Sequence, residues 1–505
     1  MAKQSSKSFM VPIGNQTVDA YTKNEHGYNL LHQLINNGQL GIAKQLVTQG
    51  MDINIKTTNE GMNAFQLVCN LFAKVVDENG KSLVRDLAKT ILSTDTYDFK
   101  VKDIQGWGTW HWAIELQDPE VFQLIQEPVN NRDKNGLTAL HFTCGTLNAA
   151  MVEAFSVHKA NFGAQDSQGL VPYARSCSKV LDYRKQNIKA AHGLSFEEQA
   201  ETILDIYLTQ GNFNIHTRTS NGDSLLHWTL GLRSTSALEK LCVRDIDKDA
   251  QDKDGQTCVF WSAKYNWTQG IECLGKFGAN MDMPNHKVHV VDNKVLTESI
   301  TPLLVGLTNN PYDFNTVKVL VSYKANIDKP SPTSGNTPLI TSVMFDHPDA
   351  TEYFLEQGAS ANVGNYKGIT PLIMSVLKGN SFITTMLASS EKVDIDQAAF
   401  STGETPFLIS ILKKNAEMVQ LFFSKRASSI ENFKSISPNS IMVNCQNKLK
   451  ALQESKDFSS LKEVNQDSAK EVSWDILNLS KHTELVMDLM GDDYPIDESS
   501  VAFGY

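Results

Sequence analysis

The sequence predicts an all-α solenoid of stacked helix pairs with β-hairpin fingers, and two observations support this prediction. The string Gly-Asn-Thr-Pro-Leu-Ile at 335–340 returns as Gly-Ile-Thr-Pro-Leu-Ile at 368–373, and a third copy, Gly-Glu-Thr-Pro-Phe-Leu, occupies 403–408. Each copy opens an apolar run, and in the first copy a second apolar run ends in Gly-Ala-Ser-Ala-Asn at 358–362. A fixed period of about 33 residues is typical of repeat architectures, because one such unit buries its apolar face only against its neighbours.

The same start can be placed eleven times along the chain, from residue 27 to about residue 435. Residues 1–20 then form an N-terminal segment or cap, 21–435 the repeat array, and 436–505 a C-terminal helical cap with an acidic tail. The starts fall, in order, at Gly27, Gly61, Gly106, Gly136, Gly169, Gly222, Gly255, Ser299, Gly335, Gly368 and Gly403.

Each residue type in the start has a mechanical reason to be there. Glycine permits the positive φ of the turn that enters the first helix. Threonine caps the helix, and proline suits the first turn, where no N–H donor is needed. An Asp or Asn before the glycine, as at Asp133 and Asp166, favours the hairpin turn that joins one repeat to the next.

This pattern resembles the ankyrin repeat, with its Gly-x-Thr-Pro-Leu-His start and Gly-Ala-Asp-x-Asn finish, over roughly four-fifths of the chain. The resemblance implies that the motif histidine is structural and hydrogen-bonds the backbone at the turn. Its recurrence also argues against catalysis, since a catalytic residue is needed once. The four copies are His32, His111, His141 and His227.

Three repeats are longer than the period, and we expect their extra residues to be insertions. Near 70–90 we predict a lengthened loop between the paired helices of the second repeat. Near 174–193 lies a basic insertion, after which Ser195 and Glu198 form a capping box that starts the delayed second helix. Two β-prone runs around a turn predict an elongated hairpin finger near 284–297. Loops on one face of a solenoid are often its binding elements.

Composition excludes several function classes. With 46 Lys+Arg against 57 Asp+Glu the net charge is −11, so we expect no nucleic-acid partner. No run of 18 apolar residues and no secretory signal is present, so we expect a cytoplasmic protein without membrane insertion. We also expect the protein to be monomeric. The seven cysteines are scattered, as expected of reduced thiols.

We also expect no catalytic residue, cofactor or metal. The string at 270–277 resembles a phosphate loop, but Phe277 stands where Ser or Thr would hold Mg²⁺. His286 and His289 have no third ligand nearby in the sequence. No nucleophile elbow occurs, and the carboxylates fall mainly in turns, where capping explains them.

Aromatic residues recur in the third to seventh repeats, and two interpretations are open for them. The residues after the motif histidine would fill the space between helices or face a concave groove; they are Trp112, Phe142, Trp228 and Trp261. Trp107 and Tyr265 occupy positions that usually face the groove, and Tyr28 corresponds to Trp107 in the first repeat. We expect this groove to bind a protein, because exposed Trp and Tyr are common anchors of interfaces.

The basic insertion adds a second candidate binding element. Its cations suit an acidic segment of a partner protein, with a solvated loop as the alternative; they are Arg175, Lys179, Arg184 and Lys185. The function we predict is a non-catalytic scaffold or adaptor. Two alternatives stay open: a bacterial effector of type IV secretion, because the C-terminus is acidic and polar, and a targeting module of an enzyme whose catalytic part lies in 436–505 or beyond.

Overall fold

The computed structural model describes residues 9–13, 16–190, 193–210, 213–291, 294–399 and 405–427. The cap and acidic tail expected at 436–505 lie outside the described residues. The chain forms two compact units, unit 1 (1–253) and unit 2 (254–505), and each unit is a stack of helix pairs. The prediction of an all-α solenoid is confirmed.

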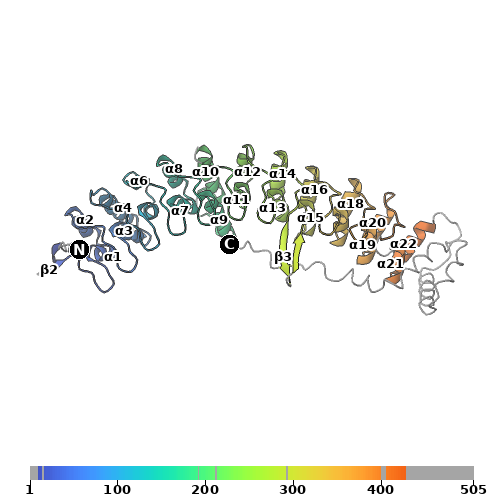
Figure 1. Ribbon diagram of the computed structural model, residues 1–505, viewed down its shortest axis with the longest axis horizontal. Coiled ribbons are helices and arrows are strands. Elements are labelled where there is room, and N and C mark those ends of the chain that lie inside the picture. Colours follow the sequence, from blue (N-terminus) through green and yellow to red (C-terminus); the bar gives the residue numbers. More distant parts are fainter. Residues whose placement is uncertain are drawn as a thin grey trace. The chain divides into compact units, whose positions relative to one another are not determined.

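Unit 1 contains six described helix pairs, arranged with the first helices in one row and the second helices in another (Figure 1). The first helices are α1 (Leu30–Asn36), α3 (Ala64–Phe72), α5 (Thr109–Ala113), α7 (Ala139–Gly145), α9 (Pro172–Lys185) and α11 (Leu225–Leu230). The second helices are α2 (Leu40–Thr48), α4 (Glu78–Leu92), α6 (Pro119–Phe122), α8 (Ala149–Val157), α10 (Phe196–Thr209) and α12 (Thr235–Cys242). A 3-10 turn, η1 (Ile114–Leu116), extends α5, and a short hairpin of β1 (Met10–Ile13) and β2 (Gln16–Asp19) precedes α1.

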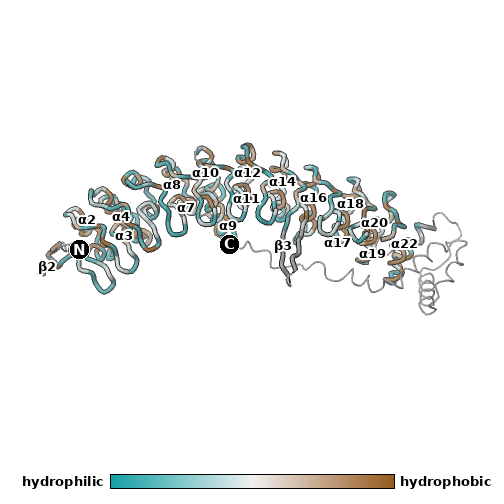
Figure 2. Tube along the Cα trace, viewed as in Figure 1, coloured by the Kyte–Doolittle hydropathy of each residue, from teal (hydrophilic) through white to brown (hydrophobic). Residues whose placement is uncertain are grey.

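Unit 2 contains five described helix pairs in the same arrangement. Its first helices are α13 (Cys258–Lys264), α15 (Pro302–Thr308), α17 (Pro338–Met344), α19 (Pro371–Lys378) and α21 (Pro406–Leu412). Its second helices are α14 (Thr268–Lys276), α16 (Phe314–Ser322), α18 (Pro348–Glu356), α20 (Ser381–Ser389) and α22 (Ala416–Ala427). The string that resembles a phosphate loop lies mostly inside α14 and does not follow a strand. In both units apolar residues concentrate in the helices and polar residues in the connections (Figure 2).

The hairpin finger expected near 284–297 is present. Strands β3 (Lys287–Val291) and β4 (Lys294–Glu298) pair antiparallel, with Val290 opposite Val295. This hairpin stands where the other repeats have a short turn before the first helix.

The repeated Thr-Pro start forms the helix caps that the sequence predicts. The side chain of Thr337 accepts a hydrogen bond from the N–H of Ile340, and Pro338 occupies the first turn of α17. Gly335 has φ +73°, and a Cβ on it would come 2.7 Å from the backbone nitrogen of Tyr366 in the next finger. Glycine is therefore required there both for the turn and for close stacking of neighbouring fingers.

Two of the expected insertions differ from the prediction. In the second repeat the connection after α3 occupies only 73–77, and the other extra residues lengthen α4 to 15 residues. In the fifth repeat the basic segment mostly extends α9, which has 14 residues, and irregular backbone follows at 186–190 and 193–195. Apolar residues such as Val84 and Val180 are buried in both helices, so burial favours helix over loop. The capping box is confirmed, with Ser195 N–H donating to the Glu198 carboxylate at 2.7 Å.

Candidate functional site

The motif histidines connect successive repeats of unit 1. The backbone N–H of Thr138 donates to Nδ1 of His141 at 3.0 Å, so the ring carries its proton on Nε2. That Nε2–H donates to the carbonyl of Leu170 in the next repeat at 3.1 Å. His32 and His111 repeat this arrangement, with the carbonyls of Ile55 and Leu137 as acceptors at 3.0 and 3.1 Å.

These hydrogen bonds require neutral rings. Burial, offset in part by the bonded carbonyl, lowers the pKa of His32 and His141 to about 4, and burial also lowers the pKa of His111. The rings therefore stay uncharged at neutral pH and hold the stack together. Their structural role, expected from the resemblance, is confirmed by these bonds.

Trp107 belongs to an aromatic cluster that joins the third and fourth repeats. Its half-buried ring stacks on His111 and meets the rings of Trp112 and Phe142 edge-on, with centroids 5.3 and 4.8 Å away. Trp112 itself is buried, with 8% of its surface exposed. The cluster thus presents the partly exposed Trp107 on a support of fixed rings.

The turn aspartate anchors the residue after the motif position that holds histidine in other repeats. In the third repeat Trp112 donates its indole N–H to Asp103 at 3.1 Å, and in the fifth Arg175 donates to Asp166 at 2.7 Å. In the sixth repeat Thr219 replaces the aspartate, and the buried indole N–H of Trp228 has no acceptor within the described part of the chain.

The seventh repeat lies in unit 2, where the aromatic pair is more exposed. Trp261 is half-buried and stacks on Tyr265, with centroids 5.6 Å apart and planes 8° from parallel. Tyr265 has 37% of its surface exposed, and the Lys264 ammonium lies over the Trp261 ring at 4.8 Å. The pair therefore gives unit 2 an exposed aromatic surface of its own.

The basic insertion is largely engaged within the protein. Besides the Arg175–Asp166 pair, Arg184 donates to the carbonyls of Gly231 and Leu232 at 2.7 and 2.9 Å and pairs with Glu197. The Lys179 ammonium lies over the Tyr183 ring at 4.6 Å, and Lys185 is exposed. Two of the four predicted cations therefore stabilise unit 1, and binding of an acidic partner by this segment stays a prediction.

Sequence reasoning missed a second set of cations on the fingers of unit 1. The side chain just before each finger turn donates to the backbone carbonyl of the corresponding residue in the next repeat. We call this series the finger ladder; it runs through Lys23, Lys56, Lys102, Arg132, Gln165 and Arg218. Its first two Nζ–O distances are 2.7 Å, and the third is 3.2 Å. The signal was available, because a long donor side chain precedes the turn in each of these repeats.

The described residues offer neither a metal site nor a membrane-spanning helix. No group of three or more His, Cys, Asp or Glu side chains in this part of the chain is placed to hold a metal ion. Nor does any described helix combine the length and the apolar character needed to cross a membrane.

Comparison with known proteins agrees with the geometry. Residues 303–399 match the family described as "Ankyrin repeats (3 copies)". An ankyrin repeat protein of fowlpox virus (strain NVSL) is 27% identical over 174 residues, which are 34% of this chain and 48% of the viral protein. The human transient receptor potential cation channel subfamily A member 1 is 26% identical over 100 residues, 20% of this chain and 9% of the channel.

The chain thus spans about half or less of the length of these relatives. Among solved structures, the ankyrin repeat domain of Bcl-3, a member of the IkappaB family, aligns over 57% of this chain and 100% of its own. That alignment has a TM-score of 0.39 and 16% identity. The repeated start, the helix pairs and the match over residues 303–399 together support an ankyrin-repeat protein, and ankyrin repeats are protein-interaction modules.

Proposed function

We propose that this protein is a non-catalytic scaffold or adaptor that captures a partner protein on the finger side of its helix pairs. The observation that supports this most directly is Trp107, a half-buried tryptophan fixed by His111, Trp112 and Phe142. A large ring held in one orientation loses little entropy on binding, which is the property of an interface anchor.

Cysteine chemistry supports a cytoplasmic location for this function. Cys69, Cys144 and Cys177 are buried free thiols, and burial raises the pKa of the Cys144 and Cys177 thiols to about 12. Such thiols are unreactive and are typical of proteins in reducing compartments. Localisation of a tagged full chain in the cells that express it would test this part of the proposal.

The function can be tested by partner capture with matched variants. The intact chain is used to isolate partners, which mass spectrometry identifies, and the affinity of each partner is then measured. Trp107→Ala should weaken binding about tenfold or more, because truncation of an anchor costs about 2 kcal/mol. The control is Phe382→Ala, which truncates another aromatic side chain, 66% exposed, on the outer helix α20.

The same experiment can contradict the proposal. Equal affinities of Trp107→Ala and the intact chain for every partner would remove Trp107 from the interface. Tyr265→Ala, measured separately, tests the part of the surface that lies in unit 2. Thermal melts should show that each variant is folded before its affinity is compared.

A further inference from the structure

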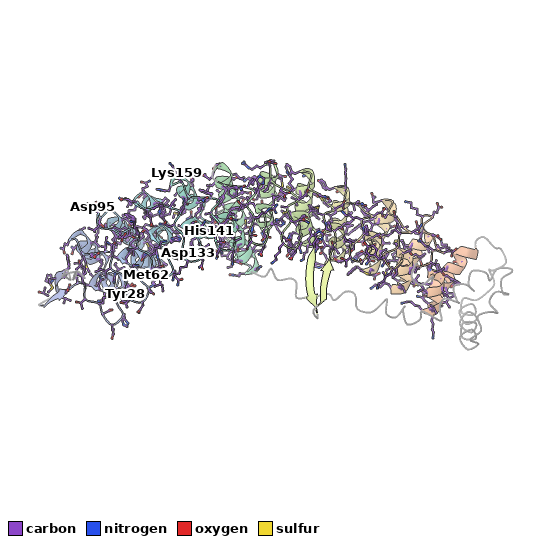
Figure 3. The ribbon with its side chains drawn as sticks, viewed as in Figure 1. Tyr28, Met62, Asp95, Asp133, His141 and Lys159 are labelled. Carbon is purple, nitrogen blue, oxygen red and sulfur yellow. The ribbon has the colours of Figure 1, made fainter. Side chains whose placement is uncertain are left out.

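The first four repeats of unit 1 place the same two side-chain types at the same two positions. A cation stands just before the finger turn, and an apolar side chain follows the turn glycine. We call these eight residues the finger strip; the cations are Lys23, Lys56, Lys102 and Arg132, and the apolar residues are Tyr28, Met62, Trp107 and Leu137. All four apolar side chains are half-buried, and three of the four cations are exposed. Figure 3 shows Tyr28, Met62 and Asp133 along the finger side of unit 1 and Lys159 on the opposite side.

The cations of the strip are fixed in place without being neutralised. None of the four forms an ion pair with a described carboxylate, whereas Lys44, Lys89 and Lys240 on the outer helices do. A lysine ammonium has three donors and a guanidinium five, so the ladder bonds leave donors for a ligand. Because the ladder already orders these side chains, a ligand that pairs with them pays little conformational entropy.

The turn carboxylates beside these cations face their own backbone. Asp133 Oδ1 accepts the N–H groups of Asn135 and Leu137, both at 2.8 Å. Asp103 accepts from the N–H groups of Gln105 and Trp107 at 2.8 and 2.9 Å and from the Trp112 indole. The negative charges of these two aspartates are thus directed into their turns, while the cations extend toward the next repeat.

In the first and third repeats the apolar ring and the cation of the strip both lie near the motif histidine. The Tyr28 ring lies 6.3 Å from the His32 ring, and the Trp107 ring 6.2 Å from the His111 ring. Lys23 lies close enough to act electrostatically on His32, and Lys102 on His111. The two rows of the strip therefore run next to each other.

The spacing of the strip selects a ligand. Neighbouring repeats lie about 10 Å apart, the distance between packed helices. In an extended polyproline-type segment every third residue is on the same side, about 9 Å further along. We propose that the finger strip binds an extended segment of a partner protein with acidic side chains at every third position and apolar side chains beside them. This proposal rests on the proposed function and names the class of partner.

The fifth repeat shows which substitution removes the positive charge and keeps the ladder hydrogen bond. In the fifth repeat Gln165 donates to the carbonyl of Arg218 at 2.8 Å from the ladder position, so glutamine can replace a cation there. The strip variant is Lys23→Gln, Lys56→Gln, Lys102→Gln and Arg132→Gln in the full chain. The matched control makes the same change in net charge on the outer helices; it is Lys44→Gln, Lys81→Gln, Lys89→Gln and Lys240→Gln.

The probe is a fluorescein-labelled peptide of four tandem Glu-Leu-Pro units, and binding is measured by fluorescence anisotropy. Two further probes are the same peptide with Gln in place of Glu and a short single-stranded oligothymidylate. We expect the Glu peptide to bind the intact chain and the control variant equally. Binding to the strip variant should be about tenfold weaker or more, since several exposed ion pairs are lost together. The Gln peptide should bind the intact chain about tenfold more weakly, and added salt should weaken only the Glu peptide.

Three results would overturn the proposal. The Glu peptide could fail to bind the intact chain, or it could bind the strip variant as tightly as the control. The oligothymidylate could bind as tightly as the Glu peptide, which would show a general polyanion site. In each case partner capture and its dependence on Trp107 are measured independently, so failure of the acidic-segment proposal is distinguishable from failure of the proposed function.

Discussion

Trp228 lacks the hydrogen-bond acceptor that the corresponding Trp112 has in the third repeat. Trp112 has Asp103 as acceptor for its indole N–H, whereas in the sixth repeat Thr219 stands in place of the aspartate and the Trp228 indole N–H has no described acceptor. Thr219 instead interacts with Asp223, a half-buried carboxyl whose pKa is raised by burial and lowered, to a smaller extent, by His227. An unsatisfied buried donor destabilises the folded state.

Restoring the arrangement of the fourth repeat should therefore stabilise unit 1. That repeat combines Asp133 before the turn with Leu137 after it. We predict that Thr219→Asp together with Asp223→Leu raises the free energy of unfolding by about 1 kcal/mol, because the indole gains an acceptor. Urea unfolding followed by tryptophan fluorescence measures the change. Thr219→Asp alone should bring no gain, since it places a second carboxylate beside Asp223; a full gain from the single change would contradict the explanation.

For single residues, the sequence predicted those roles that follow from residue type and position in the motif, and missed those that depend on distances between repeats. The histidines were predictable because they recur within a motif. The finger ladder was not predicted, because the sequence alone does not distinguish a lysine that donates to the next repeat from one that is solvated. The structure shows the difference, with Nζ of Lys23 and of Lys56 each 2.7 Å from a carbonyl of the next repeat. For the same reason the sequence left Arg184 open between an acidic partner segment and a solvated loop, and did not predict its hydrogen bonds to two carbonyls within unit 1.

At the level of elements, α9 shows why repeat length was easier to predict than element length. The period gave the number of helix pairs, because each pair needs one start and one apolar second helix. It did not show that extra residues would lengthen α9 and α4, since loop and helix were both compatible with the composition. The long α9 brings its last turn to the C-terminal end of α11, where Arg184 meets two backbone carbonyls.

This contact predicts a stabilising role for the end of α9. A cation at a helix C-terminus satisfies unpaired carbonyls and interacts favourably with the helix dipole. Arg184→Ala should lower the free energy of unfolding by about 1–2 kcal/mol, given that the side chain is partly exposed. The control is Lys189→Ala, an exposed cation just beyond the same helix, which should change stability by less than about 0.5 kcal/mol. Equal effects of the two changes in urea unfolding would show that the Arg184 hydrogen bonds contribute nothing.

At the level of the whole chain, the two units build the same repeat from different residues at the motif position. In unit 1 His32, His111 and His141 hydrogen-bond the next repeat. In unit 2 the corresponding position is apolar and buried, with Phe260, Leu304, Ile340, Ile373 and Leu408. One histidine of unit 2, His347, bonds the carbonyl of Leu307 from a different position, and burial lowers its pKa.

This difference predicts that acid destabilises unit 1 more than unit 2. The folded-state pKa of His32 and His141 is about 4, below the ordinary value of 6.5, so the unfolded chain takes up protons first as the pH falls. The stability that these rings contribute is fully present above pH 6.5 and is lost between pH 6.5 and pH 4. At pH 5 the loss is about 2 kcal/mol for each of the two histidines, with a further contribution from His111, whose pKa is also lowered. Hydrogen exchange of the full chain at pH 7 and pH 5, corrected for intrinsic rates, resolves peptides of the two units separately.

The aliphatic residues of unit 2 suggest the matched variant for this test. His141→Leu removes one titrating ring and should reduce the pH dependence of unit 1, although it lowers stability at pH 7 through the lost bond to Leu170. Unit 2 should respond weakly to acid, through His347 and its carboxylates. An equal loss of protection in both units, or an unchanged pH dependence in His141→Leu, would show that these rings are not the origin of the acid sensitivity. A loss of protection confined to unit 1 would show that the neutral histidine rings, which bond one repeat to the next, also set the pH range in which the finger surface of this unit stays folded.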